Sequence, residues 1–80
     1  MDLDFKSNME MRVLLLAIYK KEEDETLMDS VVALENNRLF TLKDGKKLLK
    51  ELKNLQYILD ERLTMMGIEK AKEVELEFKI

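Results

Sequence analysis

Residues 41–66 read TLKDGKKLLKELKNLQYILDERLTMM, and this stretch decides most of the predicted fold. Leucines recur in it at alternating spacings of four and three residues, which places them on one face of a helix. The stripe consists of Leu48, Leu52, Leu55 and Leu59, and Leu49, Leu63 and Met66 widen it. Thr41 lies three residues before Asp44, a spacing at which the two side chains can form a capping box. The pattern predicts one long helix over residues 42–66.

Gly67 follows this stretch and is predicted to end the long helix, because glycine readily adopts the left-handed conformation at a helix C-terminus. Ile68 would then pack back onto the last turn. Leu52 and Leu59 lie at the centre of the leucine stripe, so we expect both side chains to belong to the core.

A first helix is predicted over residues 8–23, beginning where Ser7 precedes Glu10 by three residues. Its centre, residues 13–19, is apolar on every side and should be the most buried part of the chain. A buried strand is the competing interpretation of so short an apolar run. Leucine and alanine outnumber β-branched residues there, which favours the helix.

A second helix is predicted over residues 27–36, with Thr26 and Asp29 as its capping box. Asn36 and Asn37 should end it, since asparagine tolerates the left-handed conformation. The four consecutive acids at residues 22–25 should form a solvated connection to the preceding helix.

The two ends of the chain carry the alternation of apolar and charged residues that is typical of a half-buried strand. At the C-terminus the apolar positions are Val74, Leu76, Phe78 and Ile80, and at the N-terminus they are Leu3 and Phe5. The C-terminal strand would pair with residues 2–5, with residues 38–42 or with another chain. The predicted fold class is α+β and mainly helical. It consists of three helices and a small two- or three-stranded β ribbon from the chain ends, in one domain over residues 1–80.

The chain contains no His, Cys, Pro or Trp. Zinc, haem and iron–sulfur ligation, thiol nucleophiles and histidine-based triads are therefore improbable, and we expect no metal, no cofactor and no enzymatic activity. Dense carboxylates occur at residues 22–25, at Asp60 and Glu61, and at Glu73, Glu75 and Glu77. The first run lacks the alternating ligands and central glycine of a calcium loop. The other acids lie outside the apolar stripes, where nothing would shift their pKa values for catalysis.

An 80-residue chain can form only a small core, and neither a disulfide nor a metal is available to reinforce it. Self-association, as a homodimer, is the remaining candidate, and Met65 and Met66 are a candidate partner surface. The net charge is −3, which argues against generic nucleic-acid binding. Residues 13–19, the longest apolar run, are too few to span a bilayer, and a cytoplasmic location is expected.

Lysines cluster opposite the leucine stripe, within an arc of about 120° at 100° per residue. These are Lys43, Lys46, Lys47, Lys50 and Lys53, which we call the lysine face. Lys46, Lys50 and Lys53 have no acid at helical spacing and are each other's neighbours, which costs a few tenths of a kcal/mol per pair. The face could be merely solvated, could be neutralised by residues 22–25, or could bind an external anion. A phosphate backbone and an acidic protein are both candidates for that anion.

Residues 39–49, LFTLKDGKKLL, resemble the "L-T-x-x-G-x-x-L-L" start of the last helix of many winged-helix regulators. In those proteins the segment follows the wing, and the helix often serves dimerisation. Two functions are therefore predicted. The first is a small non-enzymatic protein that binds partners or regulates through helix-mediated contacts. The second is a small winged-helix-like transcriptional regulator that binds nucleic acid through the lysine face.

Overall fold

The computed structural model describes residues 9–78. Its helices and strands follow one another as α2 (Met9–Lys20), α3 (Leu27–Asn36), α4 (Leu42–Asn54), β1 (Ile58–Leu59), β2 (Arg62–Leu63) and α5 (Met65–Phe78). The described part of the chain is mainly helical and carries one small antiparallel sheet, which confirms the predicted class. It contains four helices where three were predicted.

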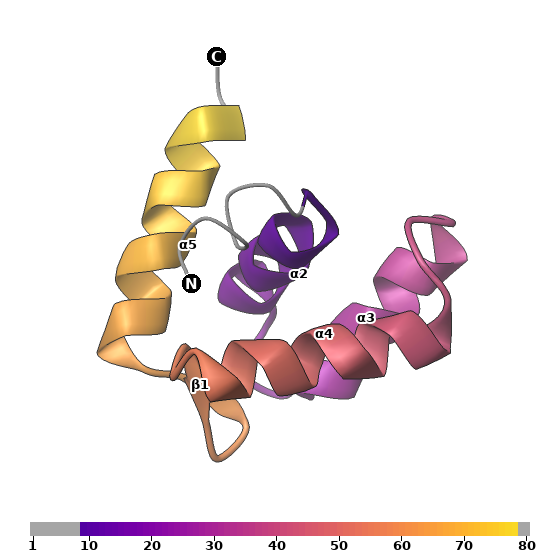
Figure 1. Ribbon diagram of the computed structural model, residues 1–80, viewed down its shortest axis with the longest axis horizontal. Helices are drawn as coiled ribbons and strands as arrows, with labels where there is room; N and C mark the ends of the chain where they lie inside the picture. The colour runs from indigo at the N-terminus through magenta and orange to yellow at the C-terminus, as the bar shows by residue number, and fades with distance from the viewer. Residues whose placement is uncertain (1–8, 79–80) are drawn as a thin grey trace.

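Helix α2 lies at the centre and contacts α3, α4 and α5 (Figure 1). Its side chains Leu14 and Leu15 are completely buried, so the apolar run forms the predicted helix and not a strand. The helix ends at Lys20, three residues earlier than predicted, and the predicted cap at Ser7 lies outside the described residues. The largest fully buried side chains come from all four helices, and they are Leu14, Leu15, Leu27, Leu52, Val31 and Val74.

The predicted capping box forms at α3, and at α4 the threonine half of it forms. The backbone N–H of Asp29 donates to the Thr26 hydroxyl at 3.1 Å, and the N–H of Thr26 donates to the Asp29 carboxylate at 2.8 Å. At α4 the N–H of Asp44 donates to the Thr41 hydroxyl at 3.2 Å. Each hydroxyl thus satisfies one of the N–H groups that a helix start leaves without a partner.

Helices α3 and α4 end in the same way, with a left-handed residue in a Schellman motif. Arg38 has φ of 62° after α3, and Gln56 has φ of 66° after α4. The next amide bonds back to the helix in each case, from Leu39 N to Leu34 O at 3.1 Å and from Tyr57 N to Leu52 O at 3.0 Å. The left-handed residue after α3 is therefore Arg38 and not one of the two asparagines before it.

The prediction of one long helix over residues 42–66 is wrong, because the chain reverses after Asn54 and forms a hairpin. Strand β1 pairs antiparallel with β2, and the register joins Ile58 to Leu63 and Leu59 to Arg62. The two turn residues, Asp60 and Glu61, have positive φ values of 51° and 68°. Two successive positive φ angles are typical of a type I′ turn, which suits the twist of a two-residue hairpin.

Leu59 projects from this hairpin and is 64% exposed, so its predicted place in the core is wrong, whereas Leu52 is fully buried as predicted. The predicted C-terminal strand is also wrong, because residues 65–78 form α5. Residues 38–42 form no strand either, and residues 2–5 and Ile80 lie outside the described part of the chain.

Gly67, predicted to end a helix, lies in the first turn of α5. Thr64 begins this helix: its hydroxyl accepts from Gly67 N at 3.1 Å and donates to the carbonyl of Gln56 at 2.6 Å. The backbone N–H of Thr64 donates to the carbonyl of Tyr57 at 3.0 Å. Thr64 therefore anchors α5 to the base of the hairpin.

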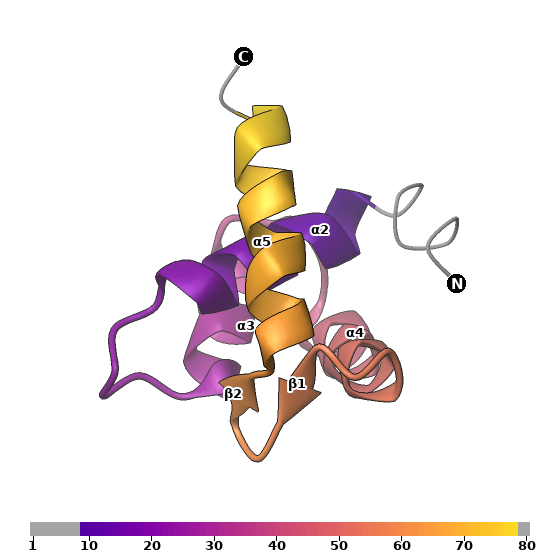
Figure 2. The same ribbon diagram turned by 90° about the vertical axis from the view of Figure 1, so that its left-hand side faces the viewer.

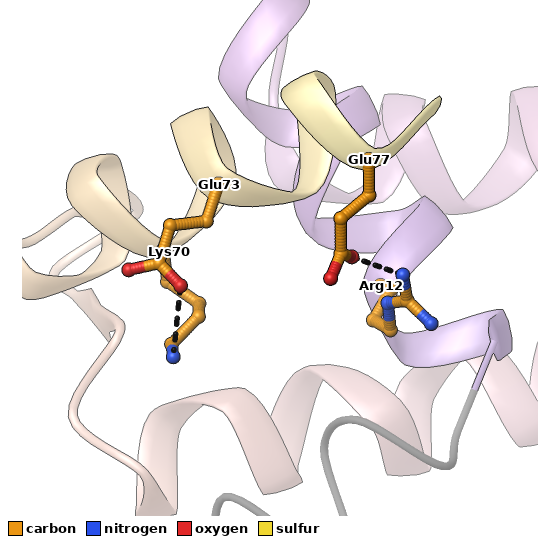
Figure 3. Close-up of polar contacts among 4 residues, drawn as sticks. All are labelled: Arg12, Lys70, Glu73 and Glu77. Atoms are coloured by element: carbon orange, nitrogen blue, oxygen red, sulfur yellow. Dashed lines mark hydrogen bonds and ion pairs between the residues drawn. The ribbon is translucent and has the colours of Figure 1, made fainter. Parts of the chain in front are cut away.

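Helix α5 crosses α2 (Figure 2), and ion pairs join the two helices. Arg12 of α2 pairs with Glu77, and Lys20 pairs with Glu75. Figure 3 shows Arg12 directed at Glu77, and Lys70 and Glu73 paired within α5. The guanidinium of Arg12 also lies 5.4 Å from the centre of the Phe78 ring, within the range of a cation–π contact.

Glu75 raises the pKa of the Lys20 ammonium above its usual 10.5, first through their hydrogen bond and then through its charge. A raised pKa in the folded state stabilises the fold at neutral pH, and this stabilisation is lost as pH rises through that pKa. Lys20 is exposed, so solvent screening keeps the contribution small.

Candidate functional site

The lysine face covers the outer side of α4. The other side of this helix, with Gly45, Leu48, Leu49 and Leu52, is buried against the core. All five lysines, from Lys43 to Lys53, are exposed, as the sequence predicts for residues opposite the leucine stripe. At 1.5 Å per residue the face is about 15 Å long.

Ion pairs do not neutralise the lysine face. Within residues 9–78 the ion pairs involve α2 and α5, and none reaches α4. Lys47 has Asp44 and Glu51 at helical spacing on its own helix. Lys46, Lys50 and Lys53 have one another instead, so part of the face carries uncompensated repulsion.

The acidic run at residues 22–25 lies elsewhere. The connection from α2 to α3 and helix α4 are at opposite sides of the view in Figure 2. Glu23, Asp24 and Glu25 face a shallow hollow of about 840 Å³, which the hairpin residues Asp60 and Glu61 also line. The interpretation that residues 22–25 neutralise the lysine face is therefore wrong.

We expect Lys50→Gln to stabilise the protein by a few tenths of a kcal/mol, because it removes contacts between like charges. Lys47→Gln is the matched control on the same helix, and it should be neutral or slightly destabilising because Asp44 and Glu51 flank that lysine. Thermal unfolding of both variants at low and moderate salt measures the difference. Equal shifts in melting temperature would show that the Lys50 neighbours exert no repulsion. Added salt should reduce the gain from Lys50→Gln.

Three carboxylates of α5 form ion pairs within the described part of the chain. Glu73, Glu75 and Glu77 pair with Lys70, Lys20 and Arg12. No group of three or more carboxylates in the described part of the chain is placed to hold a metal ion. Met65 and Met66, the candidate partner surface, are 78% and 53% exposed at the start of α5.

The comparisons with known proteins give no relative, since no protein family, no curated protein and no solved structure matches this chain. Among residues 9–78, none of the helices has the length and apolar character needed to cross a membrane. The site must therefore be interpreted from its own geometry.

Residues 39–49 do not lie where their resemblance to winged-helix regulators implies. Residues 39–49 precede the hairpin and begin α4, so they do not follow a wing. The segment that does follow the hairpin begins α5. Within residues 9–78, three helices, a two-stranded hairpin and a further helix follow one another in this order.

Proposed function

We propose that this protein is a small, non-enzymatic regulator that binds duplex DNA, with the lysine face of α4 as its contact surface. The observation that carries the proposal is a row of five exposed lysines, none in an ion pair, on the second helix of a packed α3–α4 pair. In helix-turn-helix proteins the second helix enters the major groove. The order of three helices, a hairpin and a further helix resembles that of winged-helix regulators, and this fold-level analogy supports the proposal.

The width of the lysine face favours a groove over a flat acidic surface. A helix in the major groove, which is about 12 Å wide, has a row of phosphates on either flank. The arc of about 120° places Lys47 towards one flank and Lys46 and Lys53 towards the other. An acidic protein partner would need only one stripe of lysines. Duplex DNA therefore fits the arrangement better.

Negative charge on the rest of the molecule limits its affinity for DNA. The net charge is −3, and the hairpin turn carries Asp60 and Glu61, which phosphates would repel. The hairpin is thus not suited to binding the phosphate backbone of DNA, and α4 must supply the contact. Helix-mediated protein binding, the other predicted function, does not fit α4, because its leucines Leu48, Leu49 and Leu52 are buried.

We expect a labelled duplex of about 20 base pairs, roughly two helical turns, to bind with a steep salt dependence. If the three flanking lysines, Lys46, Lys47 and Lys53, contact phosphates, the slope of log K against log salt is about −2.7, and the affinity falls about 40-fold between 50 and 200 mM salt. Lys46→Gln and Lys53→Gln should each reduce the slope by about 1. Fluorescence anisotropy over a salt series measures these quantities.

Lys21→Gln, which removes a lysine outside α4, is the control and should leave the slope unchanged. Poly-glutamate serves as the competing acidic partner, and it should bind more weakly than the duplex. The proposal is wrong if no duplex binds at low salt, if both α4 variants bind like the parent chain, or if poly-glutamate binds better.

A further inference from the structure

The side of α5 that faces away from α2 carries four exposed residues at successive spacings of four, three and four. They are Met65, Glu69, Lys72 and Leu76, which we call the α5 outer face. Met65 is 78% exposed and Leu76 is 67% exposed, although both are large apolar side chains. The opposite side of α5 is buried through Gly67, Ala71 and Val74. In Figure 2 the helix lies in front of the other elements, so its outer side is accessible.

We propose that the α5 outer face binds a second copy of this chain, with the two helices antiparallel about a two-fold axis between Glu69 and Lys72. In this register Met65 meets Leu76 of the second copy, and Glu69 meets Lys72 of the second copy. The four positions read the same from both ends as apolar, charged, charged, apolar. A two-fold interface requires such self-complementarity.

The charges of Glu69 and Lys72 favour the antiparallel arrangement over a parallel one. A parallel pair would place Glu69 against Glu69 and Lys72 against Lys72, which is repulsive. Neither residue takes part in an ion pair within the described part of the chain, so both are available to a partner. The spacing of four, three and four is also that of facing positions in paired helices.

The interface is small, since each copy offers one face of a 14-residue helix. Stable complexes bury about 1,200–2,000 Å², and smaller interfaces are weak. We expect a dissociation constant of about tens to hundreds of micromolar. The interaction uses no residue of the lysine face, so it goes beyond DNA binding and does not depend on it.

Sedimentation equilibrium of the full chain without DNA, from about 10 µM to about 1 mM, tests the proposal. The parent chain should shift from its monomer mass of 9.5 kDa towards twice that value. Glu69→Lys and Lys72→Glu should each stay monomeric, because each gives the outer face a single charge sign. Circular dichroism checks that both variants remain folded.

The double variant Glu69→Lys with Lys72→Glu exchanges the two charges and should dimerise again, because the antiparallel register still joins opposite charges. A merely structural role for either residue would not give this rescue. A parent chain that is monomeric at the highest concentration would overturn the proposal. So would single variants that dimerise like the parent, or a double variant that stays monomeric. Loss of DNA binding would affect none of these measurements.

Discussion

Gly67→Ala should destabilise the protein by about 3 kcal/mol, at the upper end of what overpacking costs. A Cβ atom at this position would lie 2.1 Å from the carbonyl oxygen of Tyr57 and 3.0 Å from its carbonyl carbon. These are backbone atoms at the hairpin base, so α5 would have to move away from the hairpin. The melting temperature should fall by about 15 °C, at 4–8 °C per kcal/mol for a domain of this size.

The expected loss of stability is opposite to the usual effect, because replacing glycine with alanine inside a helix ordinarily stabilises it by about 1 kcal/mol. Gly45→Ala in α4 is the matched control. Its Cβ would meet side chains, with Val31 Cγ1 at 2.5 Å and Phe40 Cε1 at 2.8 Å. Side chains shift more readily than backbone, so the cost should be about 1 kcal/mol. An unchanged or raised melting temperature for Gly67→Ala would contradict the close packing of α5 on Tyr57.

Leu52→Ala should cost about 2–5 kcal/mol, since it leaves a cavity at a fully buried position of α4. Proteins have about 0.05–0.15 kcal/mol of stability per residue, so this change could remove much of the total. Leu59→Ala makes the same chemical change at a position that is 64% exposed, and it should stay within about 0.5 kcal/mol of the parent. Urea unfolding of the pair measures the difference. Similar losses at both positions would contradict the hairpin.

The first half of the fold could be predicted because its local signals agree with one another. Thr26 and Thr41 begin α3 and α4 as their spacing from Asp29 and Asp44 indicates. Periodicity placed Leu52 correctly in the core. These features depend on contacts within a few residues, which a sequence records directly.

The second half could not be predicted from periodicity, because the leucine spacing continues through the hairpin. Leu55 and Leu59 keep the helical interval, yet Gln56 takes a left-handed conformation between them. The turn residues Asp60 and Glu61 lack the glycine that usually marks a type I′ turn. The apolar alternation from Val74 onward resembled a strand, although glutamate and lysine around it favour a helix. Packing against α2 buries Val74 and leaves Leu76 exposed.

The lysine face was predictable because it depends only on helical geometry within α4. The α5 outer face was not, since Met65 and Leu76 were assigned to a long helix and to a strand. The sequence-based reason for self-association, the small core of an 80-residue chain, did not indicate which surface would pair. The leucines of α4 offer no such surface, because Leu48, Leu49 and Leu52 are buried within one chain.

The ion pair between Arg12 and Glu77 joins residues 65 positions apart in the chain, and this separation bears on the order of folding. Closing so long a loop costs more entropy than forming the local contacts of α3, α4 and the hairpin. We therefore expect α5 to dock on α2 late and to open first. Amides in its last turn should exchange with solvent sooner than those near Thr64, which is tied to the hairpin. A second copy on α5 would hold the helix that opens first and so slow unfolding.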